Sequence, residues 1–131
     1  MDVVNFVKTN YIKNLLKEKE NRVIIKPNFA GGIKDKPGTQ TSPEVLSAII
    51  DILREISPDV HIIIVESGSI YWWNLKPLLR KSRYEKLFRE KNVEFINLSK
   101  TELVKHNFSG RMGIEDIPKI LLEPHLLIDV P

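Results

Sequence analysis

The chain has no cysteine, and this absence excludes several kinds of site at once. Without thiolates the chain can form neither a disulfide nor a cysteine-ligated zinc site, and it has no ligands for an iron–sulfur cluster. We therefore expect no cofactor that depends on a cysteine of this chain. The sequence leaves any other cofactor unknown.

Long hydrophobic runs and a strong charge of one sign are also lacking. No apolar run approaches the ~20 residues of a membrane span, and the first residues lack the basic stretch and apolar core of a secretory signal. The 20 basic residues exceed the 17 acidic ones by only three, a balance that does not favour a dedicated nucleic-acid binder. We expect a cytoplasmic protein with no membrane partner.

Apolar spacing and helix-start residues predict four helices. Residues 3–19 carry apolar side chains at helical spacing, Tyr11 among them, which predicts an amphipathic helix. The clearest helix start is Ser42-Pro43-Glu44, because serine can cap free amides, proline suits the first helical position and a carboxylate favours the positive helix end. From that start, an apolar face that includes Val45 runs as far as Ile56. Further helices are predicted over residues 77–91 and, more briefly, 116–122.

Short runs rich in β-branched and other apolar residues predict four strands, at residues 23–25, 60–65, 93–98 and 126–130. The run at 60–65 is the most β-branched and should be a central strand, whereas residues 99–113 are interpreted as a polar loop. Strands and helices alternate, so we predict an α/β fold: an open, mostly parallel sheet of about four strands with helices on both faces, Rossmann-like in type.

The carboxyl ends of parallel strands are where such sheets bind ligands, and we expect Lys26, Glu66 and Asp129 to lie together at that edge. Lys26 could attract an anion as a point charge, and Asn28 could donate hydrogen bonds to it. Glycines in the following loop could bring backbone amides close to a phosphate beside the helix start, although neither a Walker loop nor the dinucleotide fingerprint is present. A purely structural turn is the alternative. The candidate ligand-binding residues are Lys26, Asn28, Gly31, Gly32, Thr41, Ser42, Glu66 and Ser67.

Catalytic and metal-binding residues are not indicated by the sequence. Ser67 would need a histidine base to act as a nucleophile, and no such pairing can be deduced, so a simple polar turn explains it better. The three histidines, His61, His106 and His125, lack the short spacings of metal motifs, and we expect no metal site. The catalytic residues, if there are any, stay unknown at this point.

Four separated motifs resemble those of a family catalogued as domain of unknown function 362 (DUF362). They are IKPN at 25–28, TSPEV at 41–45, ESG at 66–68 and LIDVP at 127–131. The family usually has aspartate where this chain has Glu66, which keeps the carboxylate. The resemblance implies an α/β fold and longer members, some with a ferredoxin-like iron–sulfur module. It supplies no reaction.

Three functions remain open. We favour a single domain over residues 1–131 that is the N-terminal portion of a longer enzyme and binds a small anionic metabolite at the strand ends. The first alternative is a non-enzymatic module that associates with itself or with a partner through the final strand or through Trp72 and Trp73. The weakest is nucleic-acid binding by a basic helix, which a solvated helix face explains better. The basic residues concerned are Lys76, Arg80, Lys81, Arg83, Lys86, Arg89 and Lys91.

Overall fold

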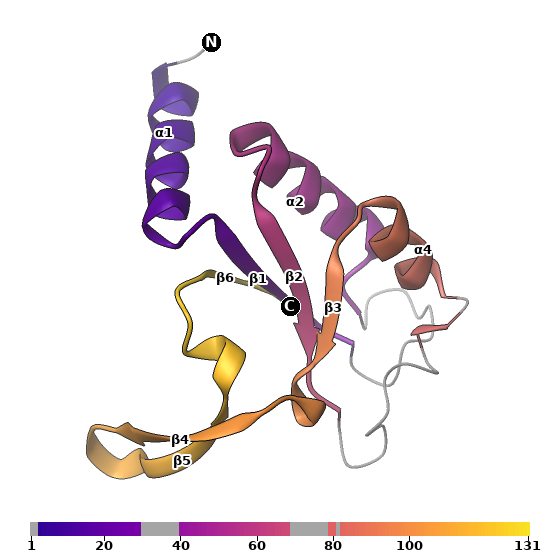
Figure 1. Ribbon diagram of the computed structural model, residues 1–131. Coiled ribbons are helices and arrows are strands. Elements are labelled where there is room, and N and C mark those ends of the chain that lie inside the picture. The colour runs from indigo at the N-terminus through magenta and orange to yellow at the C-terminus, as the bar shows by residue number, and fades with distance from the viewer. Residues whose placement is uncertain (1–2, 30–39, 69–78, 81) are drawn as a thin grey trace.

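The computed structural model describes residues 3–29, 40–68, 79–80 and 82–131 (Figure 1). In chain order the elements are α1 (Val3–Glu18), β1 (Arg22–Pro27), α2 (Pro43–Ile56), β2 (His61–Glu66), α4 (Arg83–Glu90), β3 (Glu94–Asn97), η1 (Leu98–Lys100), β4 (Leu103–Phe108), η2 (Gly110–Met112), β5 (Gly113–Pro118), η3 (Lys119–Leu121) and β6 (Leu126–Val130). The η elements are 3₁₀-helices.

Four strands form one parallel sheet in the order β3-β2-β1-β6 (Figure 1). In its register Ile25 of β1 lies opposite Ile64 of β2 on one side and Ile128 of β6 on the other. The predicted α/β fold with about four parallel strands is confirmed, and β2 is central as expected. Because the strands are parallel, their carboxyl ends meet at one edge of the sheet.

The two faces of the sheet are covered differently. On one face a large cluster joins β1 and β2 to the described helices α1, α2 and α4, through Leu16 of α1, Ile50 of α2 and Phe88 of α4. On the other face Ile63 and its buried neighbours pack against Ile120 and other half-buried side chains, which include residues of η1 and η3. Among the described residues, α-helices therefore cover one face and short 3₁₀-helices the other.

The start of α2 follows the sequence prediction. The Ser42 side chain accepts a hydrogen bond from the Val45 amide at 3.2 Å, and Pro43 occupies the first turn. Val45 itself is 46% exposed, although the sequence pattern placed it on the apolar face. The rest of the predicted face meets the core, because Leu46, Ile50 and Leu53 are buried and the partly buried Ile49 and Ile56 pack against the same cluster.

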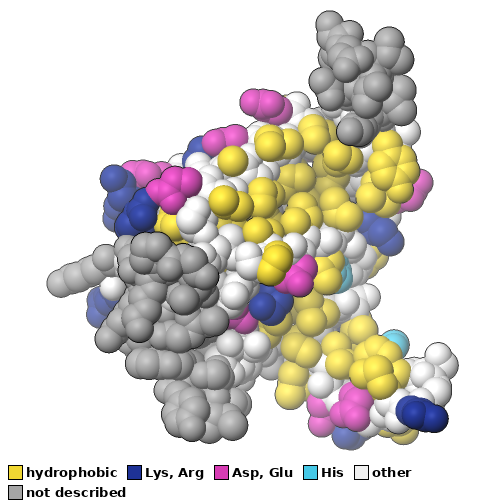
Figure 2. Space-filling view, turned by 180° about the vertical axis from the view of Figure 1, so that it is seen from behind, with side chains coloured by type: hydrophobic (Ala, Val, Ile, Leu, Met, Phe, Trp, Pro, Cys, Tyr) yellow, Lys and Arg dark blue, Asp and Glu magenta, His cyan; other side chains and the backbone are white. Residues whose placement is uncertain are grey.

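Hydrophobic side chains also gather in a broad area of the surface seen from behind in Figure 2. In α1, Tyr11 was expected to face inward but is 68% exposed, whereas Leu16 is fully buried. A helix at the margin of a sheet has only a narrow buried stripe, so a neighbouring apolar residue can remain in water.

In the part of the chain that the structure describes, no helix is long and apolar enough to cross a membrane.

Residues 99–122 differ most from the sequence prediction. In place of a polar loop and a short helix, β4 and β5 form an antiparallel hairpin, in which Lys105 lies opposite Asp116. Helical structure within the predicted 116–122 segment is limited to the 3₁₀-turn η3, since Pro118 ends β5. Gly110 and Gly113 adopt positive φ angles, which glycine tolerates, and they turn the chain between the strands. The hairpin projects away from the main sheet (Figure 1).

The predicted helix over 77–91 is represented by α4. Ser82 caps α4 by accepting a hydrogen bond from the Glu85 amide at 3.2 Å, so this helix begins at Arg83. Residues 77, 78 and 81 of the prediction lie outside the described residues. Tyr84, Leu87 and Phe88 of α4 are buried, which confirms the inward face at its C-terminal end.

Candidate functional site

An ion pair joins the carboxyl ends of β1 and β2. The Lys26 ammonium lies 3.4 Å from Oε1 of Glu66, and it donates a hydrogen bond of 3.2 Å to the Pro27 carbonyl. The two partners differ in accessibility, because the side chain of Lys26 is 40% exposed and that of Glu66 only 11%. Lys26 is therefore the partner that solvent, or a ligand, can reach.

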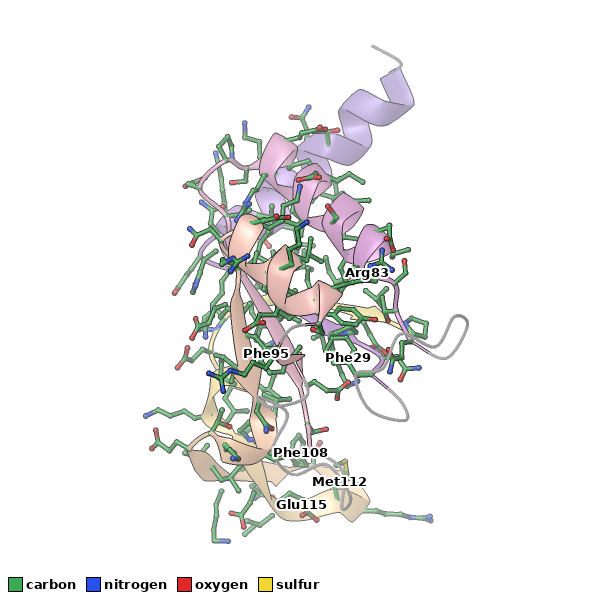
Figure 3. All side chains as sticks on the ribbon, turned by 90° about the vertical axis from the view of Figure 1, so that its right-hand side faces the viewer. Phe29, Arg83, Phe95, Phe108, Met112 and Glu115 are labelled. Carbon is green, nitrogen blue, oxygen red and sulfur yellow. The ribbon has the colours of Figure 1, made fainter. Side chains whose placement is uncertain are left out.

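Glu66 is held in place by backbone amides. Its Oε2 accepts a hydrogen bond from the Phe29 amide at 3.3 Å, and its Oε1 accepts one from the Ser67 amide at 2.8 Å. Phe29 is in turn buried against Tyr84, with ring centroids 4.8 Å apart, and lies beside α4 in Figure 3. The carboxylate thus holds the chain that leaves β1 against the end of β2. Hydrogen bonds from backbone amides to an ionised carboxylate are stronger than those to a neutral acceptor.

Thr41 connects three elements at the same edge. Its hydroxyl accepts a hydrogen bond from the Asn28 amide at 2.8 Å and donates one to the Val130 carbonyl at 2.6 Å. Its own amide donates to the Asn28 carbonyl at 3.0 Å, and its carbonyl accepts a hydrogen bond of 2.8 Å from the Tyr84 hydroxyl. These hydrogen bonds connect the start of α2 to the ends of β1 and β6. Both hydrogen-bond partners of the Thr41 hydroxyl are backbone groups.

The strand order reverses direction at β1. From β1 the chain moves outward to β2 and β3, and it returns to the other side of β1 with β6. Lys26 and Asp129 lie opposite each other across this boundary, so their side chains share one face of the sheet. Sequence reasoning placed Asp129 at this edge but did not include it among the ligand-binding candidates, although the carboxyl end of the last strand was the available signal.

The structure describes the positions of some, but not all, of the remaining ligand-binding candidates. Ser42 caps α2, and the exposed Ser67 follows Glu66 at the end of β2. Gly68 donates its amide to the Ser99 hydroxyl at 2.8 Å, a contact that the sequence did not predict. The loop candidates Gly31 and Gly32 lie outside the described residues, as do Trp72 and Trp73. The structure thus brings together Lys26, Asn28, Thr41, Ser42, Glu66 and Ser67 at one edge.

The basic helix face makes contacts with acidic residues of α2. Arg83 pairs with Glu44, and Lys91 lies 2.6 Å from Asp51. These two helices also border an open cavity of about 280 Å³, which is lined by both acidic and basic side chains. None of its lining residues belongs to the strand-end edge. They are Pro43, Glu44, Ser47, Arg83, Lys86, Leu87 and Glu90. Ion pairs with α2 engage Arg83 and Lys91 of this basic face, and this arrangement adds no support for nucleic-acid binding.

Titratable groups with shifted pKa values lie near the opposite edge. The Ser57 hydroxyl lowers the pKa of Asp59 just before β2, and the Arg22 guanidinium lowers the pKa of Glu123 just before β6. His61 also lies at this amino edge, at the first residue of β2. Within the described ranges, no group of three or more histidine, cysteine, aspartate or glutamate residues is placed to hold a metal ion.

The final strand has features that bear on association with a partner. In the described sheet β6 is an edge strand, and its Leu127 is 54% exposed. Edge strands with exposed apolar residues favour association. Interaction with a partner through this strand stays a prediction.

Comparison with known proteins gives one match. A family model described as Domain of unknown function (DUF362) matches residues 23–131, from β1 to the end of β6. Searches among curated proteins and solved structures found no match.

Proposed function

The chain belongs to the DUF362 family, and from this premise and the geometry of the strand ends we propose that it binds a small anionic ligand. The site lies at the carboxyl edge of the sheet, between β1 and β6, and Lys26 supplies the positive charge. In this proposal the domain is the N-terminal portion of an enzyme, and it orients a metabolite for groups that the described residues do not include.

The place of Lys26 carries the proposal. Open α/β sheets bind ligands outside the carboxyl ends of the strands, where the strand order reverses, and Lys26 ends β1 at that boundary. The Lys26 side chain is partly exposed, and its partner Glu66 already accepts hydrogen bonds from two backbone amides. An incoming anion can therefore bind Lys26 while Glu66 keeps hydrogen bonds. The first turn of α2 lies at the same edge through Thr41, and its dipole favours negative charge.

Substitution of Lys26 by alanine tests this role. We expect Lys26→Ala to weaken binding of acetate, inorganic phosphate and the free amino acid glycine by about tenfold or more, because a hydrogen bond to a charged group is lost. Affinities would be measured from amide chemical-shift changes in two-dimensional NMR spectra, which also show where the probe binds.

A matched lysine is available as the control. Lys105 lies on the hairpin and pairs with Asp116 at 3.2 Å, far from the strand ends in sequence and in a separate sheet. Lys105→Ala should leave the affinities unchanged. Equal affinities of Lys26→Ala and the wild type, or shift changes confined to other elements, would contradict the proposal.

A further inference from the structure

Among the described residues, the strand-end edge carries charges of both signs. Lys26 contributes one positive charge, whereas Glu66 and Asp129 contribute one negative charge each. Glu66 cannot turn away easily, because the Phe29 and Ser67 amides hold both of its oxygens. The register sets Lys26 and Asp129 on one face of the sheet and Glu66, which is level with Pro27, on the other. On the face that carries Lys26 and Asp129, a ligand with one negative and one positive group is therefore matched better than a ligand with negative charge only.

From this charge pattern we infer that the ligand is a zwitterion of the amino-acid type, a conclusion that rests on the proposed function. Its anionic group binds Lys26, and its ammonium group lies toward Asp129. Like-charge repulsion from the Asp129 carboxylate disfavours anions that lack an ammonium.

The spacing of the groups is suitable. Lys26 and Asp129 are register partners on adjacent strands, which lie roughly 4.8 Å apart, and their side chains share one face. An acid group and an ammonium on neighbouring carbons can contact both side chains at once. The exposed position of Asp129 leaves its carboxylate open to such a contact.

Glycine and acetate form the test pair, because they differ only in the ammonium group. Both would be titrated by NMR against the wild type, Asp129→Asn and Lys26→Ala. We expect the wild type to bind glycine about fivefold more tightly than acetate, as the gain from a partly exposed ion pair allows. Asp129→Asn should reduce this preference by weakening glycine binding, whereas Asp116→Asn on the hairpin, the matched control, should keep it.

The outcomes separate the two proposals. If the wild type binds acetate as tightly as glycine, or if Asp129→Asn keeps the full preference, the zwitterion inference is wrong, while the role of Lys26 can still stand. If Lys26→Ala binds both probes like the wild type, or if neither probe binds the wild type, the proposed function fails and the inference fails with it. Because Asp129 is exposed, Asp129→Asn should fold normally, which its spectrum verifies.

Discussion

Replacing Thr41 by valine should lower the free energy of unfolding by about 2–3 kcal/mol, because two partly buried backbone groups lose their partner. The Thr41 hydroxyl accepts a hydrogen bond from the Asn28 amide and donates one to the Val130 carbonyl, and a valine side chain can do neither. Valine has nearly the shape of threonine, so packing should change little. Urea denaturation followed by circular dichroism would measure the loss.

A second threonine provides the control for this substitution. The Thr101 hydroxyl donates one hydrogen bond of 2.9 Å, to the Leu98 carbonyl within the turn that follows β3. Thr101→Val should cost only about 1 kcal/mol, as a single local hydrogen bond implies. Similar losses in the two variants would show that Thr41 does not have the connecting role that its contacts indicate.

Replacing Ile64 by alanine should have the largest effect on stability, about 3–4 kcal/mol, because it opens a cavity in a well-packed core. Ile64 is fully buried in the middle of β2 and belongs to the cluster that joins the sheet to the helices. The surrounding strands are held by ladder hydrogen bonds and can close such a cavity only in part. The change would be measured by chemical denaturation.

An exposed isoleucine is the matched control for the core variant. Ile52 of α2 is 54% exposed, so Ile52→Ala removes the same atoms largely from water. Its effect should lie within about 0.5 kcal/mol of zero, since alanine also favours the helix. A loss for Ile64→Ala no larger than that of Ile52→Ala would contradict the position of Ile64 in the core.

The parallel sheet could be predicted because its signals are local. The β-branched run 60–65 has few alternatives to a buried strand, and Ser42-Pro43 combines a cap with a first-turn proline. The hairpin was missed because neither of its faces is fully buried. In β4, Val104 and His106 are half-buried between exposed neighbours, so the alternation in hydrophobicity is weak. Figure 3 shows Phe108, Met112 and Glu115 on this hairpin, apart from Phe29 and Phe95.

The candidate site was predictable as a location but not as a set of contacts. The parallel arrangement alone puts Lys26, Glu66 and Asp129 at one edge. The hydrogen bonds of Thr41 depend on a partner 89 residues away in the chain, which no local pattern specifies. The same is true of Glu66, whose bond to the Phe29 amide requires the actual path of the chain after β1.

The strand order has a consequence for how the chain folds. Pairing of β1 with β2 closes a loop of about 40 residues, whereas pairing of β1 with β6 closes one of about 100, at a higher entropic cost. The β1–β2 pair should therefore form early and β6 should dock last. Lys26 and Asp129 would then be brought side by side only in the final step. Pulse-labelling hydrogen exchange during refolding should protect the amides of β2 before those of β6; simultaneous protection would argue against this order. A ligand that contacts both β1 and β6 would then stabilise a contact that forms only after the transition state. It would therefore slow unfolding more than it speeds folding.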